Sequence, residues 1–571
     1  MKIITYSQTT AATLKDDIGK ADYSYYFIYK KYLPLLHQIG EVIEIRNPST
    51  EVDAIYASSG NVPCVFLSFT PPHGTATELK CPTVCVFAWE FDTIPNEVID
   101  EIIESNWAHM LEKIGHALTI SNFGAKAALR DVPQLNIGVV PSPIKTSMDK
   151  VLADVSADRF QFCIDGSVYD SDCYSAEEGV FITKDAHPAW DQEKTSFEFS
   201  DKNPNTAAML AGFFPVESWG AWCASETPRV LLPFSIDEGV VVELVLVGYG
   251  HNIDKAIGVN LGTQRLELTI EAGLQKYQLV FAECKHATKI VFDSIDLTIP
   301  PGTHETRMIG LGVKHITISQ MPKTRFKTAL HRIKKLPQKF SIDRKPEPIE
   351  LELEGVIYTS IFNPSDGRKN WQDMLTAFCW AFKDEPNATL LLKMTSWQAS
   401  NFLGLLGHLI AALQPFRCRV VIVHGFLDDL QFAQMQKGTH FIVNTSYCEG
   451  QCLPLMEFMA EGIPAVAPTH TAMSDYIEDA NAFSFDTHLK TTIWPNDSRI
   501  AIRALHYQPN WESLVDAFQR SYEVFIEQPE AYQEMRRASI RSVYESASPE
   551  VLAPRLKSFL KEVAETPLVA T

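Results

Sequence analysis

Two glutamates with seven residues between them, Glu449 and Glu457, are the side chains whose types and spacing point most directly to chemistry. The apolar run Phe441–Val443 predicts a buried strand, the polar residues after it an exit loop, and residues 454–460 a helix. A proline in the first turn gives up no needed donor, and the free amides there form a positive end that suits a phosphate. The pattern predicts a site for a nucleoside diphosphate. The alternative is an ordinary strand–helix unit with two surface glutamates.

Two adjacent cations, Arg368 and Lys369, lie in an earlier loop. Residues 355–360 before them predict a strand, and residues 371–382 after them predict a helix with one apolar face. An arginine holds phosphate oxygens with its planar fork and a lysine acts as a point charge, so the pair can bind a diphosphate. The alternative is a solvated pair that adds solubility.

Two loops in the first part of the chain carry groups able to act on a hydroxyl. His73 follows a predicted strand at 64–68, and Glu90 follows another at 83–88. Ligands of open α/β sheets gather beyond the carboxyl ends of the strands, where a carboxylate or imidazole can steer an acceptor hydroxyl. The alternative for both is a solvated loop residue. No GxGxxG pattern is present, so a dinucleotide fingerprint is absent.

The elements that must position these groups are predicted to be parallel strands alternating with helices. Residues 1–148 and 350–540 both alternate short apolar runs with helical patterns, which is typical of βαβ units. A chain of 571 residues is also too long for a single core. We therefore predict an α/β protein with two Rossmann-like domains, followed by a last helical segment at 541–571.

The segment between these parts, residues 149–322, consists of short β-rich runs separated by turn residues, which predicts an antiparallel sandwich or jelly roll. Trp219 and Trp222 in it could stack on sugar rings, but packing within the sandwich is the interpretation we favour. Asp170 and Asp172 mimic a metal-holding pair. They lie far from any predicted strand–helix unit, so we expect no metal site there.

Charge and hydropathy limit the partners. The net charge of −20 disfavours nucleic acid. A basic run at 323–345, with nine Lys or Arg against one Asp, lies in a segment, 323–349, that we interpret as a linker. The alternative for this run is contact with anionic lipid or a lipid-linked acceptor.

No apolar run approaches the ~20 residues of a membrane span, and the 11 cysteines lack metal-binding spacing. We expect a cytoplasmic protein with reduced thiols, or one bound peripherally at the inner face of the membrane.

Taken in chain order, the cation pair, a turn at Gly425 and the glutamate pair resemble the nucleotide-sugar half of retaining glycosyltransferases of family four, which have the GT-B fold. This resemblance covers about residues 352–480. The first part resembles the acceptor half through residues 86–90 and 119–123, and the sandwich resembles β domains inserted in some bacterial transferases through 215–220. The resemblance implies two Rossmann-like domains facing a cleft, an inserted jelly-roll-like sandwich, and a last helix packed back on the first domain.

The resemblance also implies roles for single residues. Arg368 and Lys369 would neutralise the departing diphosphate without a metal ion, and Glu449 would contact hydroxyls of the donor sugar. In the acceptor half, His73 is the nearest candidate for a histidine close to the reacting carbon, with Glu90 beside it. The glycine-rich first loop common in the family is replaced here by residues 18–24. The donor-binding residues implied by position are Gly425, Gly450, Gln451, Cys452, Leu453 and, on the ribose, Glu457.

The implied activity is a metal-independent, retaining transfer of a hexosyl group from a GDP- or UDP-sugar to a glycan or lipid-linked glycan, in bacterial surface polysaccharide synthesis and with no cofactor. Attack would occur on the front face, with the leaving phosphate accepting the acceptor's proton, so no second carboxylate pair of the hydrolase type is required. The alternatives are a non-catalytic glycan-binding or assembly protein that uses the sandwich, and, less favoured, a GT-B phosphorylase, for which no pyridoxal-binding lysine context is recognisable.

Overall fold

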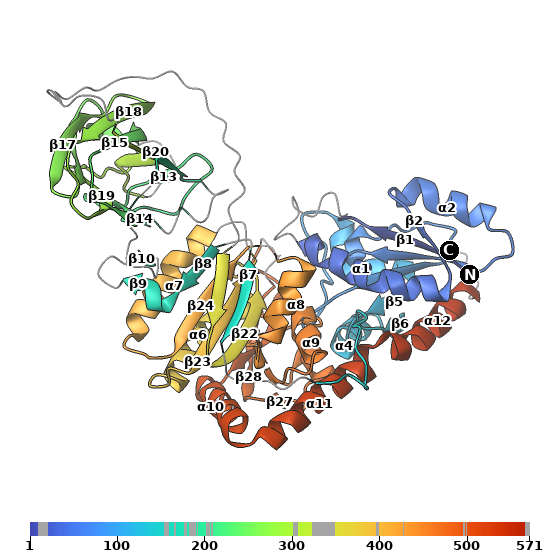
Figure 1. Cartoon of the computed structure of the whole chain (residues 1–571). Helices are drawn as coiled ribbons and strands as arrows, with labels where there is room; N and C mark the ends of the chain where they lie inside the picture. The colour runs from blue at the N-terminus through green and yellow to red at the C-terminus, as the bar shows by residue number, and fades with distance from the viewer. Residues whose placement is uncertain are drawn as a thin grey trace.

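The computed structural model contains two α/β bodies built on parallel sheets and an antiparallel β body that stands off to one side (Figure 1). Its two largest sheets have six and seven strands. The structure describes residues 1–565 apart from 10–20, 153–158, 165–166, 176–179, 182–189, 191, 201–205, 207–208, 301–306, 322–348, 396–398, 426, 495–496 and 498. The predicted basic segment at 323–345 therefore lies outside the described residues.

The first domain is a six-stranded parallel sheet in the order β2-β1-β3-β4-β5-β6. Central strands read as continuous apolar runs because both their faces are covered, and all six residues of β3 are buried. The strands predicted at 64–68 and 83–88 form here as β3 and β4. The strands are β1 (Lys2–Ser7), β2 (Glu41–Glu44), β3 (Cys64–Phe69), β4 (Thr83–Phe87), β5 (His116–Thr119) and β6 (Asn136–Val139).

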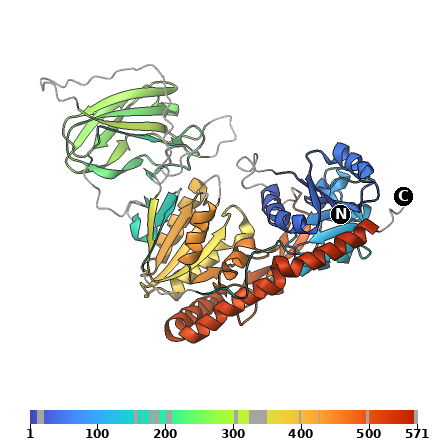
Figure 2. The same ribbon diagram turned by 45° about the vertical axis from the view of Figure 1, so that its right-hand side comes forward.

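Helices from both ends of the described chain cover this sheet. The cluster formed by α1 and β3 also contains Leu552, Leu556, Leu560 and Val563 of α12, all four with no exposed surface. In Figure 2, α12 lies along the first domain, although α11 before it belongs to the second. The helices on this domain are α1 (Ala21–Ile39), α2 (Pro48–Ser58), α3 (Trp107–Ile114), α4 (Asn122–Asp131) and α12 (Pro549–Glu565).

The second domain contains a seven-stranded sheet in the order β27-β26-β25-β22-β23-β24-β8, parallel except for the edge strand β8. The strands are β22 (Val356–Phe362), β23 (Ala388–Met394), β24 (Arg419–His424), β25 (Phe441–Val443), β26 (Ala465–Val466), β27 (Ala482–Phe483) and β8 (Ser167–Asp170). The helices are α6 (Trp371–Ala381), α7 (Ala399–Leu413), α8 (Asp429–Lys437), α9 (Leu453–Met459), α10 (Trp511–Glu527) and α11 (Pro529–Ala547).

The predicted boundary at residue 541 differs from the structure, because it falls inside the continuous helix α11. The break between the last two helices occurs at Ser548, whose backbone is extended, and Pro549 begins α12. A proline is well suited to a first helical turn, and it disfavours a helical conformation in the residue before it.

The predicted sandwich boundaries, 149 and 322, are also too wide. β7 (Phe160–Ile164) pairs antiparallel with β21 (Ile349–Leu353), and β8 joins the sheet of the second domain beside β24. A short β-rich run has the same pattern whichever sheet it joins, so the sequence did not distinguish these strands from the sandwich. The chain thus enters the second domain before it enters the sandwich.

The acidic pair predicted not to bind metal helps to attach β8. Asp170 Oδ2 accepts hydrogen bonds from Arg419 Nε and Nη2 at 3.1 and 2.7 Å, and Ser171 Oγ accepts one from Val420 N–H at 2.9 Å. Asp172 is exposed, and its backbone N–H donates to Asp170 Oδ1 at 3.1 Å. Within the described residues, no group of three or more His, Cys, Asp or Glu is placed to hold a metal ion.

The antiparallel body consists of two five-stranded sheets, β11-β20-β15-β18 with β13 beside β20, and β12-β14-β19-β16-β17. Its described core cluster draws only on residues 190–318, because alternate side chains of both sheets face inward. The strands are β11 (Lys194–Glu198), β12 (Leu210–Ala211), β13 (Ala221–Trp222), β14 (Arg229–Ile236), β15 (Val240–Gly248), β16 (Ala256–Leu261), β17 (Gln264–Thr269), β18 (Leu274–Phe281), β19 (Ala287–Asp293) and β20 (Leu311–Gln320).

The two tryptophans of the sandwich pack against it. The rings of Trp219 and Trp222 meet edge to face at 4.9 Å, and Trp219 Nε1 donates to Glu217 at 2.8 Å. A Cβ on Gly312 would lie 2.4 Å from the Trp219 ring, so the ring lies directly on that strand. These contacts agree with the packing interpretation of both residues.

Among the helices of the described residues, none combines the length and the apolar character needed to cross a membrane. The cysteines at 64, 81, 85 and 379 are buried and unpaired, in agreement with their position in apolar runs.

Candidate active site

Glu449 lies in the loop after β25 with only 3% of its surface exposed. Its Oε1 accepts hydrogen bonds from Lys369 Nζ at 2.6 Å, Ser446 Oγ at 2.6 Å and Asn444 Nδ2 at 3.2 Å. Its Oε2 accepts one from Arg368 Nη1 at 2.9 Å. The structure therefore brings together three residues predicted from separate parts of the sequence.

The loops that carry these residues meet because β22 and β25 are adjacent parallel strands. The cations occupy a short 3₁₀ turn, η5 (Gly367–Lys369), after β22. Asn370 then takes a left-handed backbone with φ of 48°, and its Nδ2 donates to Thr445 O at 3.3 Å. Thr445 Oγ1 donates back to Asn370 O at 3.1 Å, and Tyr447 N–H donates to Arg368 O at 2.8 Å. The two loops are fixed to each other through their backbones.

Burial and charge oppose each other at this carboxylate. Burial by itself would raise the pKa of Glu449, but the positive charges of Lys369 and Arg368, together with the hydrogen bonds from Lys369 and Ser446, hold that pKa well below its usual range. Burial would likewise lower the pKa of Arg368, whereas Glu449, Glu90 and Asp366 raise it. Glu449 is therefore ionised at neutral pH and paired with two cations.

Glu90 of the first domain completes this group of charges. Its Oε1 lies 3.4 Å from Arg368 Nε, and Asp366 Oδ2 lies 2.9 Å from the same nitrogen. Burial raises the pKa of Glu90, and the nearby Arg368 acts against that rise. A Cβ on Gly450 would lie 3.6 Å from the backbone of Trp89, so the two domains touch at this point. The carboxyl ends of both parallel sheets thus face the same site.

Glu457 lies at the same interface, but its partner is different. It projects from α9 and forms an ion pair with Lys31 of α1, with 24% and 30% of the two side chains exposed. Among the residues that the structure describes, it forms no hydrogen bond or ion pair with the group around Glu449. Its backbone carbonyl accepts from Gln436 Nε2 at 3.0 Å. The second glutamate therefore links the domains in this structure.

Residues 450–453 serve mainly to connect elements. Gln451 is buried, and its side chain both accepts from Ser142 N–H at 3.0 Å and donates to Ser142 O at 3.1 Å. Cys452 has a left-handed backbone with φ of 63° and receives a hydrogen bond from Asn444 Nδ2 at its sulfur, at 3.1 Å. Leu453 begins α9, a helix of seven residues that starts one position before the predicted one.

Gly425 is not brought into this group. It follows β24, and both β22 and β23 separate that strand from β25. Three strand spacings of about 4.8 Å place it roughly 14 Å across the sheet. Gly425 therefore does not contact Glu449, although the two residues belong to the same ordered set in the sequence.

His73 is exposed and lies in a 3₁₀ turn, η1 (Pro72–Gly74), after β3. Its Nδ1 accepts a hydrogen bond from Trp107 Nε1 at 3.0 Å, and Trp107 in turn contacts the Trp89 ring at 4.6 Å. His73 is thus connected to the Glu90 loop through two tryptophans.

Sequence reasoning missed a second loop beside Glu449, which follows β26. Thr471 Oγ1 accepts from Glu449 N–H at 3.1 Å, and Ala472 N–H donates to Glu449 O at 3.2 Å. His470, with 5% of its surface exposed, stacks on Tyr507 at 4.5 Å and 10°. The available signal was position, because polar residues follow two neighbouring buried strands, directly after β25 and three residues after β26.

A hairpin of β28 (Thr487–Ile493) and β29 (Arg503–Pro509) was also missed, and it covers this site. It carries Tyr507, and the Tyr447 ring stacks on His506 at 4.6 Å. Both the connecting loop and β29 reach the first domain. The Trp494 ring of the loop lies 6.1 Å from the Trp89 ring, and Leu505 N–H of β29 donates to Asp92 Oδ1 at 2.8 Å.

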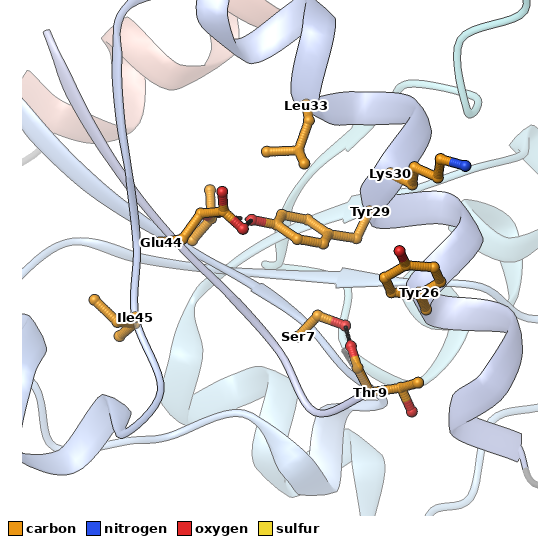
Figure 3. A pocket seen from close by; sticks show the side chains of 9 residues that line it. Ser7, Thr9, Tyr26, Tyr29, Lys30, Leu33, Glu44 and Ile45 are labelled. Carbon is orange, nitrogen blue, oxygen red and sulfur yellow. Dashed lines mark hydrogen bonds between the residues drawn. The ribbon is translucent and has the colours of Figure 1, made fainter. Parts of the chain in front are cut away.

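A cavity of about 180 Å³ lies on the first domain between α1 and the ends of β1 and β2 (Figure 3). Tyr29 crosses it and donates from its hydroxyl to Glu44 at 2.7 Å. None of the sequence-predicted site residues lines it; its lining residues are Thr5, Ser7, Thr9, Tyr26, Tyr29, Lys30, Leu33, Glu44 and Ile45.

Comparison with known sequences identifies one domain. Residues 183–320 match a family described as a domain of unknown function, DUF7024. This range coincides closely with the antiparallel sandwich. The chain matches no curated protein sequence.

Among solved structures, the chain is similar to a TarM variant from S. aureus in complex with fondaparinux, alpha-GlcNAc-glycerol and UDP, at 12% identity and a TM-score of 0.28, over 37% of this chain and 36% of that one. It is similar to the pneumococcal O-GlcNAc transferase GtfA in complex with UDP and GlcNAc, at 15% identity and a TM-score of 0.27, over 37% of each chain. It is also similar to a glycosyltransferase from Rickettsia africae, at 13% identity and a TM-score of 0.28, over 37% of this chain and 49% of that one. The chain thus spans less than half of the length of each of these proteins.

Proposed function

We propose that this protein is a glycosyltransferase that moves a sugar from a nucleoside-diphosphate donor, such as a UDP- or GDP-sugar, to a hydroxyl of a glycan or lipid-linked glycan. The observation that supports the proposal is the convergence of Arg368 and Lys369 on the buried Glu449, at the carboxyl ends of adjacent parallel strands and opposite Glu90. The cations suit the anionic diphosphate, and the carboxylates suit hydroxyl groups, so one site can hold both parts of such a donor.

In the proposed reaction, the bond between the anomeric carbon and the phosphate oxygen breaks, and the diphosphate leaves with the electron pair. The acceptor hydroxyl oxygen bonds to the same face of that carbon, and its proton passes to the departing phosphate. Arg368 and Lys369 stabilise the charge that develops on the leaving group, in place of a metal ion. Configuration is retained because bond formation and bond breaking occur on one face.

The remaining predicted residues have roles at the two sides of this reaction. Glu449 accepts hydrogen bonds from hydroxyls of the donor sugar. Glu457 accepts hydrogen bonds from the ribose once its ion pair with Lys31 has opened. Glu90, with its raised pKa and its position on the first domain, faces the acceptor hydroxyl. The contact of Glu90 with Arg368 supports an acceptor that enters between the two parallel sheets.

The first test is binding. UDP, GDP and ADP are added separately in a thermal-shift experiment, because a ligand that binds only the folded state raises the melting temperature. We expect one of them to raise it, and Lys369→Ala to reduce that rise. A matched control is Lys383→Ala, which removes an exposed lysine of the same domain. The absence of a shift with all three nucleotides would contradict the proposal.

The second test is donor turnover with UDP-glucose and GDP-mannose, in the presence and absence of EDTA. We expect Glu449→Ala and Lys369→Ala to lose about 10²- to 10³-fold in turnover, and Glu457→Ala to lose about tenfold in donor affinity. The exposed Glu523→Ala is the matched control. Undiminished transfer in all three site variants would exclude this site, and loss of transfer with EDTA would exclude a metal-independent reaction.

A further inference from the structure

A buried histidine nitrogen in the loop after β26, which Thr471 links to Glu449, has no hydrogen-bond partner among the described residues. This atom is Nε2 of His470, whose side chain is almost fully buried. Buried polar atoms are nearly always hydrogen-bonded, and leaving one unpaired costs about 1–3 kcal/mol. A residue that only filled space at this position would not need that nitrogen.

The neighbouring hydrogen bonds define the state of the ring. Thr471 Oγ1 accepts from Glu449 N–H at 3.1 Å and donates its own proton to His470 O at 2.8 Å. Its contact of 3.3 Å with His470 Nδ1 then requires Nδ1–H to be the donor. Burial lowers the pKa of His470 to about 4, so the ring is neutral at physiological pH and has one proton. Nε2 therefore presents a lone pair, which makes it an acceptor.

The ring and the backbone next to it are both constrained. The ring stacks on Tyr507 of the covering hairpin at 4.5 Å and an interplanar angle of 10°. The next residue, Thr471, has a φ of 51°, which is unusual for a β-branched residue. Strained backbones of this kind persist where surrounding contacts enforce them, and they cluster at functional sites.

The carboxylate of Glu449, whose backbone N–H is bonded to Thr471 Oγ1, supplies a second acceptor. Three donors already reach its Oε1, whereas within the described part of the chain Oε2 receives one hydrogen bond, from Arg368 at 2.9 Å. When a diphosphate draws Arg368 toward itself, Oε2 becomes available. A neutral nitrogen acceptor and a carboxylate oxygen suit a ligand with O–H donors, and they disfavour phosphate oxygens, which have no donor and repel the carboxylate.

We propose that His470 Nε2 accepts a hydrogen bond from a hydroxyl of the donor sugar, in addition to the hydroxyl that the proposed function assigns to Glu449 Oε2. The inference rests on the proposed function and deepens it, because it assigns the class of sugar: one that carries free hydroxyls at both positions, rather than a deoxy sugar. It also separates the donor into two parts, with the diphosphate on Arg368 and Lys369 and the sugar on His470 and Glu449.

The test compares bare nucleotides with nucleotide sugars by isothermal titration calorimetry. UDP and GDP are compared with UDP-glucose and GDP-mannose, in the wild type, His470→Phe and His470→Gln. We expect His470→Phe, which keeps the stacked ring, to weaken binding of the nucleotide sugar about 3- to 10-fold while the bare nucleotide binds unchanged. Gln, whose amide oxygen can reach the position of Nε2, should restore most of that affinity.

Two results would overturn the inference. The first would also overturn the proposed function, and the second would leave that function standing. A wild type that binds none of the four compounds would overturn the proposed function and this inference with it. A wild type that binds them, together with an equal effect of His470→Phe on bare nucleotide and nucleotide sugar, would overturn this inference alone. If His470→Phe does not fold, His470→Asn keeps a polar atom toward Thr471 but none at the position of Nε2, and the same comparison applies.

Discussion

Single residues in this site are governed by burial and charge acting together. At Glu449 the two cations outweigh burial, and the carboxyl group stays ionised. At His470 burial dominates, and the ring stays neutral. Arg368, Lys369 and Glu449 could be predicted from the sequence because their residue types form a recognisable ordered set. His470 could not, because one histidine after a buried strand has no pattern of its own.

The pKa of His470 leads to a prediction about acid stability. An unfolded histidine has a pKa of about 6.5, and in the folded chain burial lowers the pKa of His470 to about 4. The unfolded state therefore binds more protons between these values, so the free energy of unfolding falls as pH drops from 6.5 toward 4. We expect His470→Gln to reduce this fall by about 1–3 kcal/mol.

Urea unfolding at pH 7.5 and pH 5 measures this difference. The quantity to compare is the change in unfolding free energy between the two pH values, because the substitution also changes stability at a single pH. An identical change in wild type and variant would show that His470 is not buried as a neutral ring.

At the scale of elements, the loop after β25 is fixed to the segment that joins the domains. The side chain of Gln451 satisfies both Ser142 N–H and Ser142 O inside the protein. We expect Gln451→Ala to lower the free energy of unfolding by about 2–4 kcal/mol, because both backbone groups lose their partners. Exposed Gln134→Ala, measured by the same urea titration, should change it by less than about 0.5 kcal/mol. Equal effects would contradict the role assigned to this contact.

The last helix is a structural part of the first domain. Leu556 of α12 has no exposed surface and packs with α1 and β3, whereas the neighbouring Lys557 is exposed. We expect Leu556→Ala to cost about 2–5 kcal/mol and Lys557→Ala less than about 0.5 kcal/mol. Hydrogen exchange should localise the loss of protection to the first sheet. Loss of protection confined to α12 would show that the helix is dispensable there.

Several helices and strands could be predicted from the sequence, and others could not. Strands such as β3 and β4 could be predicted because their residues are buried on both faces and form continuous apolar runs. The hairpin of β28 and β29 could not, since its strands are mostly exposed or half-buried and show no clean alternation. The assignment of β7 and β8 to the second domain depends on pairing with distant strands, which local patterns do not reveal.

At the scale of the molecule, the sandwich is separable from the rest of the described chain. Its core cluster draws on residues 190–318, and the other described clusters include none of them. The paired strands β7 and β21 form a stem on either side of it in the sequence. We expect a protein in which a short Gly-Ser linker replaces residues 190–321 to fold and to bind nucleotide as the full chain does.

Thermal unfolding of the shortened protein, with and without UDP or GDP, is the appropriate measurement. The isolated segment 183–320 offers a complementary test, because a body with its own core should unfold cooperatively by itself. Loss of nucleotide binding in a well-folded shortened protein would place part of the donor site in the sandwich.

The position of α12 has a consequence for how the protein is made. The first sheet is complete at Val139, but the helix that covers it begins at Pro549, about 400 residues later. At about 5–20 residues per second, translation needs roughly 20–80 s to cover that distance. During that interval the apolar surface that will receive Leu552, Leu556 and Leu560 stays open on the nascent chain. Helix α12 therefore completes a domain whose sheet was synthesised about 400 residues earlier, and that sheet exposes an apolar surface to chaperones in the meantime.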